Sequence, residues 1–375
     1  MGKSMTKPLP KRSRRPLVRP AGTSSRSSEY LATLEAGWQE HLAPRAHNAP
    51  TVISTFAGCG GSSLVYSMAG FRELLAVEWD DHAVECFRLN FPDVPVYHGD
   101  IAALSVEECC DLAGVVPGEL DVLDGSPPCQ GFSMAGRRQL DDPRNQLFQE
   151  FVRLLDGLRP KAFVMENVSG MVKGKMRLVF AEVIGSLKEC GYNVEARLLN
   201  AARYGVPQSR QRIIFIGVLN GVSAWPRPHQ HVVTVRDACA DLPITETSHA
   251  ALRNERSIQL ANVIPPGDCN GGGKYSLRLY GSQTGFGMSR LSWDKPSCTI
   301  PKTRTERSTP IVPNRNELIA GRWLTRLGAF PDGYEFVGND THIQARIGNS
   351  VPPLFMKAIA ETLRREVLSR GDEAQ

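Results

Sequence analysis

Short apolar runs recur along most of the chain, and segments with helical periodicity lie between them. The runs have four to seven residues rich in Val, Ile, Leu and Phe, which is typical of strands covered on both faces. They predict strands at 51–57, 74–78, 94–97, 120–123, 162–165, 193–199 and 212–218. Helical spacing of apolar residues predicts helices at 80–90, 144–158 and 175–189. This alternation favours an α/β fold with a doubly wound, mostly parallel, seven-stranded sheet.

The pattern changes between 220 and 300. Apolar runs become short there, and Gly, Pro and Ser are frequent. We therefore predict a small β/loop domain, which is mildly basic and carries several aromatic residues. Such a domain fits a reader of nucleic acid, and an irregular insertion is the alternative. Helical periodicity returns at 320–328 and 353–368, so 301–368 are predicted to form a hinge and rejoin the sheet domain of 49–219.

The first 48 residues differ from the rest in charge. Residues 1–50 hold nine Lys or Arg and three Glu, whereas the whole chain of 375 residues has a net charge of only +5. Residues 1–27 are rich in Pro, Ser, Lys and Arg and are expected to be disordered, and 369–375 form a short tail. The basic segment suits either a polyanionic partner or a solvated tail. A short helix that packs on the body is predicted by apolar residues at helical spacing: Leu31, Leu34, Trp38 and Leu42.

Composition argues against several classes of protein. Hydrophobic residues make up 41% of the chain, enough for a large core. No apolar run approaches the roughly 18–20 residues of a membrane span. The nine cysteines include no CxxC pair and no His/Cys group at zinc spacing, so we expect reduced thiols and no bound metal. These features predict a cytoplasmic protein without membrane contact.

Small and acidic residues follow three of the predicted strands. Glycines at 58, 60 and 61 would let a ligand approach the backbone at a helix N-terminus. Glu78 lies 20 residues after Gly58, at the spacing of a ribose-binding carboxylate. Asp100 is placed to accept a hydrogen bond from an adenine amine. Together these residues predict a nucleoside pocket. Ser63 stands where a dinucleotide fingerprint needs glycine, which disfavours a dehydrogenase.

A sharp turn follows the fourth predicted strand. Pro127-Pro128 must end that strand and hold Cys129 at the edge of the sheet. A thiol in this place is a candidate nucleophile, and a buried structural cysteine is the alternative. Glu166 ends the next strand, and Arg210 and Arg212 lead into the last one. One of the two arginines is expected to face the cleft.

Seven motifs occur in one order with consistent spacing: FAGCGG (56–61), EWD (78–80), GDI (99–101), GSPPCQGFS (125–133), ENV (166–168), QSRQR (208–212) and RIGNSVPP (346–353). In these motifs the chain closely resembles the DNA cytosine-5 methyltransferase family over about residues 50–368. The resemblance implies a Rossmann-like methyltransferase fold and the cofactor S-adenosyl-L-methionine, with S-adenosyl-L-homocysteine as product. It also implies a monomeric enzyme that acts on double-stranded DNA, with 220–300 as its target-recognition domain.

The resemblance gives three side chains a part in the chemistry. Cys129 would add to carbon 6 of a flipped cytosine, and Glu166 would hold and protonate ring nitrogen 3. Arg212 would contact the cytosine oxygen and assist catalysis. Arg210 would support this site.

The same resemblance assigns binding residues. Gln130 and Ser133 would belong to a mobile loop that closes over DNA, and Arg210 is grouped with them. Glu78 would bind the cofactor ribose, Trp79 would stack on its adenine, and Asp100 would accept from the adenine amine. The full cofactor set would be Phe56, Gly58, Gly60, Glu78, Trp79, Asp100, Ile101, Pro128, Leu147, Asn349 and Ser350.

Two positions depart from the family pattern, and two rival functions stay open. Ser54 stands where an aspartate often begins the first motif, and Trp323 stands where a glutamate is common. These changes bear on cofactor affinity and on packing. One rival is a tRNA cytosine-5 methyltransferase, whose usual Cys-Phe-Thr signature is absent from 220–300. The other is an inactive DNA-binding relative, which the intact Cys129 and Glu166 disfavour. Restriction–modification, regulation and phage self-protection all suit such an enzyme.

Overall fold

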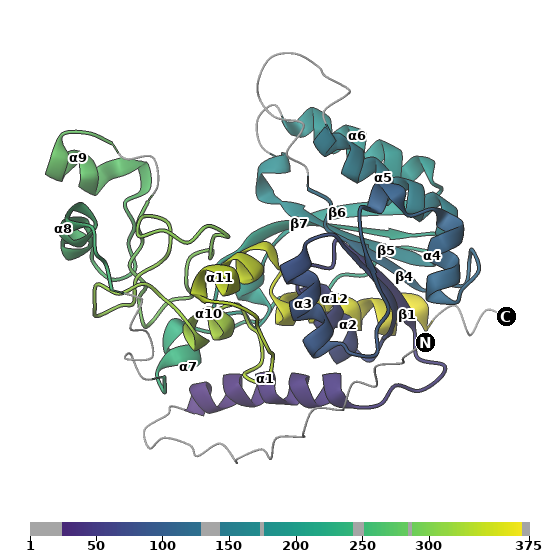
Figure 1. Cartoon of the computed structure of the whole chain (residues 1–375), viewed down its shortest axis with the longest axis horizontal. Coiled ribbons are helices and arrows are strands. Elements are labelled where there is room, and N and C mark those ends of the chain that lie inside the picture. Colours follow the sequence, from purple (N-terminus) through teal and green to yellow (C-terminus); the bar gives the residue numbers. More distant parts are fainter. Residues whose placement is uncertain (1–24, 129–142, 173–175, 243–250, 284–286, 370–375) are drawn as a thin grey trace, which may run out of the picture.

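The computed structural model of the chain describes residues 25–128, 143–172, 176–242, 251–283 and 287–369. Within these residues, seven strands form one sheet in the order β3-β2-β1-β4-β5-β7-β6 (Figure 1). They are β1 (Thr51–Thr55), β2 (Arg72–Glu78), β3 (Val96–His98), β4 (Val122–Gly125), β5 (Ala162–Val168), β6 (Asn193–Asn200) and β7 (Gln211–Val218). Strand β7 is antiparallel to both neighbours, and the other pairs are parallel. The predicted doubly wound, mostly parallel α/β sheet is confirmed.

Alternate side chains of the central strands enter two cores on opposite faces of the sheet. Val52 and Ile53 are neighbours on β1 but belong to different cores, and Phe163 and Val164 divide in the same way on β5. Both faces are therefore buried, which explains why the strands read as continuous apolar runs. One face is covered by α2 (Gly61–Met68), α3 (Asp81–Asn90) and α12 (Pro353–Leu363). The other is covered by α4 (Val106–Ala113), α5 (Pro143–Leu158) and α6 (Met176–Glu189).

The sheet brings the ends of several strands to one edge. The chain moves outward from β1 to β2 and β3, and then returns to place β4 on the other side of β1. Because β1, β2, β4 and β5 are parallel, their carboxyl ends share an edge. Doubly wound sheets bind ligands beyond the carboxyl ends at such a reversal of strand order. Residues that are far apart in sequence can therefore form one site at this edge.

A small lobe, residues 251–320, packs around a core of its own that includes Leu260, Met288 and Ile311. The sequence predicted a small β/loop domain at 220–300. The described residues of 220–320 form loops joined by isolated β-bridges, together with short helices. These helices are α7 (Val235–Cys239), α8 (Glu255–Val263) and α9 (Lys274–Tyr280).

These short helices begin at local caps rather than at a periodic pattern. Helices of five to nine residues make too few turns to show clear periodicity. Thr234 and Asp237 form a reciprocal capping box that starts α7, and the Asn254 side chain accepts from the amide of Ser257 at the start of α8. Such caps satisfy amides that have no partner inside a helix.

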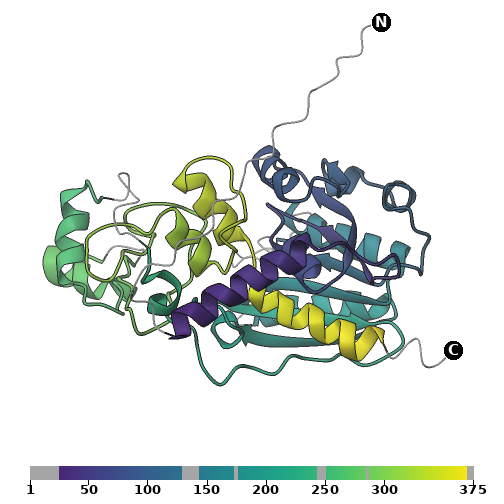
Figure 2. The ribbon, with the colours of Figure 1, turned by 90° about the horizontal axis from the view of Figure 1, so that it is seen from below.

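Helix α1 (Ser25–Leu42) confirms the predicted N-terminal helix and lies against both parts of the molecule. Figure 2 shows α1, in purple, passing α12, in yellow, and reaching toward α7. The Tyr30 hydroxyl donates to the backbone oxygen of Arg326 at 2.6 Å. At the other end of α1, Glu40 pairs with Lys357 of α12 at 2.6 Å. The helix thus joins the sheet domain to the segment that returns from the small lobe.

Short turns and two further helices complete the described chain. They are η1 (Ile101–Ala103), η2 (Ser169–Val172), η3 (Ala201–Arg203), η4 (Gly271–Gly273), α10 (Arg322–Leu327), α11 (Asp340–Asn349) and η5 (Arg364–Leu368). None of the helices in the described ranges is long and apolar enough to cross a membrane.

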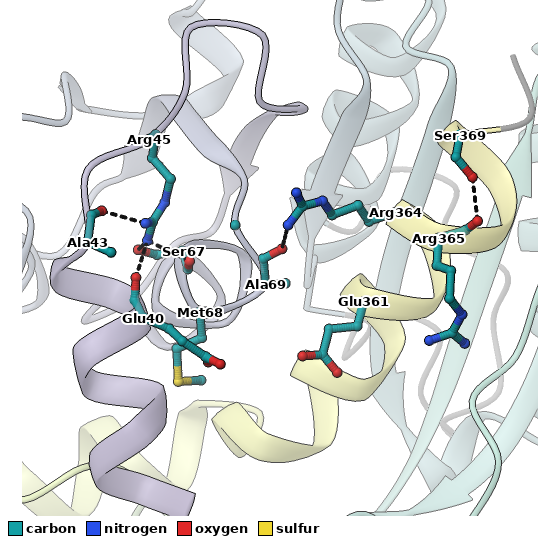
Figure 3. Close-up of a pocket in the computed structure, with 11 residues that line it drawn as sticks. Glu40, Ala43, Arg45, Ser67, Met68, Ala69, Glu361, Arg364, Arg365 and Ser369 are labelled. Carbon is teal, nitrogen blue, oxygen red and sulfur yellow. Dashed lines mark hydrogen bonds between the residues drawn. The ribbon is translucent and has the colours of Figure 1, made fainter. Parts of the chain in front are cut away.

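A hollow of about 620 Å³ lies between α1, the end of α2 and η5 (Figure 3). Arg45 lines it and donates to the backbone oxygens of Glu40 at 2.8 Å and Ser67 at 2.6 Å. Arg364 donates to the Ala69 oxygen at 2.9 Å. These arginines cap the ends of α1 and α2. Since α2 begins at the carboxyl edge of the sheet, its last turn and the hollow lie away from the site described next.

Candidate active site

Glu166 and Arg212 form an ion pair across two neighbouring strands at the carboxyl edge. Arg212 pairs with Val168 in the antiparallel register of β5 and β7, so Glu166 is its diagonal neighbour on the same face. The Arg212 Nε lies 2.5 Å from Glu166 Oε1. The two side chains are only 13% and 11% exposed. The structure therefore brings together two residues that the sequence predicted to be catalytic.

The surroundings of Glu166 favour its protonated form. Burial raises the pKa of the Glu166 carboxyl, and the positive charges of Arg212 and Arg210 oppose this shift without reversing it. A carboxyl with a raised pKa can carry a proton nearer neutral pH than an exposed glutamate can. This property suits a group that must give a hydrogen bond or a proton to a ring nitrogen.

Arg210 lies behind the pair, with 2% of its surface exposed. Its Nη2 donates to the Gly348 oxygen at 2.8 Å, and its Nη1 donates to the Ile300 oxygen at 3.4 Å. Burial, with a smaller effect of the neighbouring Arg212, lowers the pKa of Arg210 to about 9. The contacts fit the predicted supporting role. They correct the grouping of Arg210 with the DNA-facing loop, because a buried side chain is not available to DNA.

The turn before Cys129 is held in place by β1 and β5. The Asn167 side chain donates from Nδ2 to the Pro127 oxygen at 3.0 Å, and Thr55 Oγ1 donates to the Asp124 oxygen at 2.9 Å. A Cβ on Gly125 would overlap the Thr55 hydroxyl, so this position needs glycine. Sequence reasoning did not assign Asn167, although its place in the ENV motif was a signal. The turn leads toward the end of β5, where Glu166 lies.

The predicted nucleophile itself lies outside the described residues. The described chain reaches Pro128, which is exposed, and resumes at Pro143. The predictions for Cys129, Gln130 and Ser133 fall in this interval, and so their positions are not part of the described site.

The loop after β1 and the end of β2 form a polar cradle. Glu78 is 8% exposed, and its Oε2 accepts from the Gly58 amide at 2.7 Å. Its Oε1 accepts from the amides of Trp79 and Asp80, each at 2.9 Å. Gly58 has a φ of 59°, and the space beside its Cα is open. At Gly60, with a φ of 93°, a Cβ would overlap the Phe91 ring. Both glycines therefore have a steric reason to be there.

Next to this cradle, Trp79 is 77% exposed, which leaves its ring face free to stack on a flat ligand. Asp100 is exposed, and its Oδ1 accepts from the Ala102 amide at 3.0 Å. Ile101 is buried beside it. These three residues follow the ends of β2 and β3, as the sequence predicted.

The remaining predicted cofactor residues lie nearby in different environments. Ser350 ends α11 and packs against Gly61, where an added Cβ would lie 3.0 Å from its hydroxyl. Asn349 is exposed, Leu147 is half-buried on α5, and Phe56 has a left-handed backbone with a φ of 56°. Tyr334, which sequence reasoning missed, donates to the Cys59 oxygen and holds the glycine loop from the C-terminal side.

The comparisons with known proteins agree with this geometry. The model of the C-5 cytosine-specific DNA methylase family matches residues 50–365. The chain belongs to this family. A relative in Haemophilus parahaemolyticus, the Type II methyltransferase M1.HphI, is 37% identical over 327 residues, which cover 84% of this chain and 86% of the relative. The Type II methyltransferase M.XorII of Xanthomonas oryzae pv. oryzae is 32% identical over 387 residues, with 87% and 89% covered.

Solved structures give the same family at the level of the fold. A protein described as a DNA modification methyltransferase encoded within a prophage of E. coli has a TM-score of 0.67 and 26% identity, and the match covers 84% of this chain and 99% of that one. The Dnmt2 methyltransferase of S. pombe has a TM-score of 0.60 over the same shares of the two chains. Its identity of 19% shows a common fold only.

The two departures from the C-5 methylase pattern are both buried. Ser54 lies under the glycine loop, near two buried carboxyl groups. The Ser63 hydroxyl donates to Glu73 at 2.7 Å, and the Tyr66 hydroxyl donates to Asp124 at 3.0 Å. Burial raises the pKa of Glu73 and that of Asp124 to about 7 each. This family member therefore keeps two carboxyls in its core near the place where the usual aspartate is replaced.

Trp323, the second departure, is 3% exposed and packs on Trp293 with ring centroids 5.6 Å apart. This contact joins α10 to the part of the small lobe that contains Trp293. In the described chain, no group of three His, Cys, Asp or Glu side chains could hold a metal ion.

Proposed function

We propose that this chain methylates carbon 5 of a cytosine flipped out of double-stranded DNA, within a specific short sequence. The observation that carries the proposal is the Glu166–Arg212 pair at the carboxyl edge, beside the turn that leads to Cys129. Membership of the C-5 methylase family supports the same reaction. S-adenosyl-L-methionine would be the methyl donor and S-adenosyl-L-homocysteine the product.

The chemistry needs these residue types. Carbon 5 of cytosine is too weak a nucleophile to take a methyl group directly. Addition of the Cys129 thiolate to carbon 6, while Glu166 protonates ring nitrogen 3, would turn carbon 5 into an enamine carbon. Bound S-adenosyl-L-methionine supplies the methyl group from its sulfonium. Removal of the carbon-5 proton by a base such as water then expels the thiolate from carbon 6, and ring nitrogen 3 returns its proton to Glu166.

Arg212 would serve this sequence in two ways. Its guanidinium already holds Glu166 and would orient the cytosine oxygen beside it. A free cysteine has a pKa of about 8.5, so positive charge nearby would favour the thiolate of Cys129. Arg210, buried behind the pair, would hold the start of β7 against the end of α11 through its hydrogen bond to the Gly348 oxygen.

The position of the polar cradle supports its proposed role as the cofactor site. Glu78 would offer its carboxylate to the ribose hydroxyls, Trp79 would stack on the adenine, and Asp100 would accept from the adenine amine. The open space beside Gly58 leaves room for a ligand at the start of α2. The other residues that would line the site are Phe56, Gly60, Ile101, Pro128, Leu147, Asn349 and Ser350.

Duplex DNA hides the target carbon, so the base must leave the helix at a cost of a few kcal/mol. We propose 220–300 as the target-recognition domain and the loop with Gln130 and Ser133 as the part that closes over DNA. We further propose a basic extension at 1–48 and a hinge within 301–368. The enzyme would act as a monomer. Duplex DNA would lie between the small lobe and the sheet edge.

Tritium transfer from labelled cofactor to DNA tests the reaction. The wild-type protein is expected to label duplex DNA, and Cys129→Ser to reduce labelling to background. Cys110→Ser is a matched control, because Cys110 is half-buried on α4, a helix that carries none of the predicted site residues. A wild-type protein that binds the cofactor but labels no DNA would overturn the proposal and favour the inactive relative. Preferential labelling of tRNA would favour the tRNA enzyme.

Expression in a host that lacks methylation, followed by bisulfite mapping, tests sequence specificity. A fixed short motif around each 5-methylcytosine is the expected result. The relatives named above are Type II methyltransferases, which supports a role in restriction–modification. Methylation without any common flanking sequence would contradict a specific target.

A further inference from the structure

Two cysteines of the small lobe, Cys269 and Cys298, lie beside the same serine. Cys269 and Ser289 face each other in an antiparallel bridge. The flanking hydrogen bonds run from the Asn270 amide to the Met288 oxygen at 2.7 Å and from the Arg290 amide to the Asp268 oxygen at 2.9 Å. The two residues thus form a pair that is not itself hydrogen-bonded, the arrangement that brings opposite side chains closest.

Cys298 meets the same serine from a different segment. Its Sγ lies 3.1 Å from the Ser289 hydroxyl. The Ser289 side chain is therefore a close neighbour of both Cys298 and Cys269. This proximity brings together two thiols that are 29 positions apart in the sequence.

The two cysteines lie on different segments of the small lobe, and these segments have different neighbours. Cys269 lies in the small lobe. Cys298 lies in a segment that runs beside the strand entering the active site, since the Ser209 amide donates to the Ser297 oxygen at 2.7 Å and Thr299 Oγ1 donates to the Ser209 oxygen at 2.9 Å. A bond between the two sulfurs would tie the Cys269 segment to the segment of the same lobe that borders Arg210.

Exposure separates this pair from the other described cysteines. Cys269 and Cys298 are exposed, Cys110 is half-buried, and five others are buried. Burial of the thiol end raises the pKa of Cys298 although the residue as a whole is exposed, and the hydrogen bond with Ser289 partly opposes the shift.

We propose that Cys269 and Cys298 are a reversible oxidation site, which a peroxide converts to an intramolecular disulfide. The Cys269 thiolate attacks a peroxide oxygen and breaks the O–O bond, which gives a sulfenic acid and hydroxide. The Cys298 thiol then attacks the sulfenic sulfur, the S–S bond forms, and water leaves. In total, the two thiols give two electrons and two protons to one hydrogen peroxide, and the products are one disulfide and two water molecules. A thiol reductant restores the dithiol.

Peptide mapping of the full-length protein tests the site directly. The reduced protein is treated with a small excess of hydrogen peroxide, quenched with an alkylating reagent and digested with trypsin without reductant. Cleavage after Arg256, Lys274, Arg290 and Lys302 releases peptides 257–274 and 291–302, because the Lys295–Pro296 bond resists trypsin. The expected product is the two peptides joined by a disulfide, which dithiothreitol separates.

Variants identify the pair. Cys269→Ser and Cys298→Ser should each abolish the joined peptide, whereas Cys110→Ser should retain it. Recovery of both peptides unlinked after oxidation, or linked to a different cysteine, would overturn the proposal. If a Ser variant fails to fold by circular dichroism, Cys269→Ala replaces it, since Cys269 is exposed. This readout does not depend on methylation, so it stands or falls apart from the proposed function.

The consequence for DNA rests on the proposed function and has its own readout. The disulfide would restrain the proposed recognition region, so oxidised protein is expected to bind duplex DNA at least about threefold more weakly, with recovery on reduction. The Cys269→Ser variant should show no such change on oxidation. Equal affinity of the linked and reduced forms would remove the functional effect, while the joined peptide would still establish the oxidation site.

Discussion

The Arg210 guanidinium donates to the backbone oxygen of Gly348 at 2.8 Å and so joins two motifs 138 residues apart. Arg210 precedes the catalytic candidate Arg212 by two residues on the chain, and Gly348 directly precedes the Asn349-Ser350 pair beside the glycine loop. The Glu166–Arg212 pair and the proposed cofactor site are therefore connected through one buried cation rather than through solvent.

Arg210→Lys should lower the free energy of unfolding by about 1–3 kcal/mol, because a lysine cannot satisfy both backbone oxygens that Arg210 contacts. Urea denaturation measures the loss. Arg88→Lys is a matched control at an exposed position on α3, and it should change stability by less than about 0.5 kcal/mol. Equal losses in the two variants would contradict the connecting role of Arg210.

Methylation should depend on the protonation of Glu166. Its pKa is raised by burial, and the proposed reaction uses the protonated form. The single-turnover rate is therefore expected to fall as pH rises through that raised pKa. Glu166→Gln should reduce the rate by about 100- to 10,000-fold and remove this basic limb. Single-turnover rates measured from about pH 5.5 to 9 test this dependence. If the fall in rate at high pH persists in Glu166→Gln, a group other than Glu166 causes it.

The buried carboxyls of Glu73 and Asp124 should make stability depend on pH. Their pKa values are about 7 in the folded chain and about 4 in an unfolded one. The folded state therefore binds more protons between these values. Their contribution to stability is fully present below about pH 4 and is lost as pH rises toward 7.

Glu73→Gln should remove part of this dependence. Its free energy of unfolding, relative to wild type, is expected to rise by about 1–3 kcal/mol between pH 5 and pH 8. Asp111→Asn, at an exposed position on α4, serves as the control and should leave the dependence unchanged. Parallel curves for Glu73→Gln and wild type would show that Glu73 titrates as an ordinary exposed glutamate.

Trp79→Ala should weaken binding of S-adenosyl-L-homocysteine by about tenfold, since a stacked aromatic pair contributes roughly 0.5–1.5 kcal/mol beyond its buried area. The side chain is 77% exposed, so the thermal midpoint without ligand should hardly change. Calorimetric titration gives the affinity. Leu89→Ala, at a position on α3 that is 52% exposed, should bind the ligand as wild type does. Unchanged affinity in Trp79→Ala would remove this residue from the proposed pocket.

The sheet could be predicted from the sequence because a strand that is buried on both faces consists of consecutive apolar residues. The same logic placed Glu78 and Asp100 at strand ends, where the structure has them. Helix α11 was not predicted from the sequence; Gly348 and Asn349 are its last two residues, and Ser350 is its C-cap. The local sequence pattern does not show whether a residue between two helices belongs to the end of the first or to the start of the second.

Contacts between distant segments could not be predicted in this way. The partners of Arg210 are two backbone oxygens, and a backbone oxygen has no sequence signature. Asn167 was passed over for a similar reason, since its partner is the Pro127 oxygen. Cys129 stays a prediction from its motif, because it lies outside the described residues.

Helices α1, α2 and α12 pack against one another, so this part of the core can form only after α12 has been synthesised. The ribosome delivers α2 well before α12, the helix that packs against it. Until α12 emerges, the nascent chain exposes an apolar face of α2, and exposed apolar surface promotes aggregation and chaperone binding. A premature stop before residue 353 would therefore remove a wall of the core, and the shortened product is expected to be degraded rather than to act as a weak enzyme.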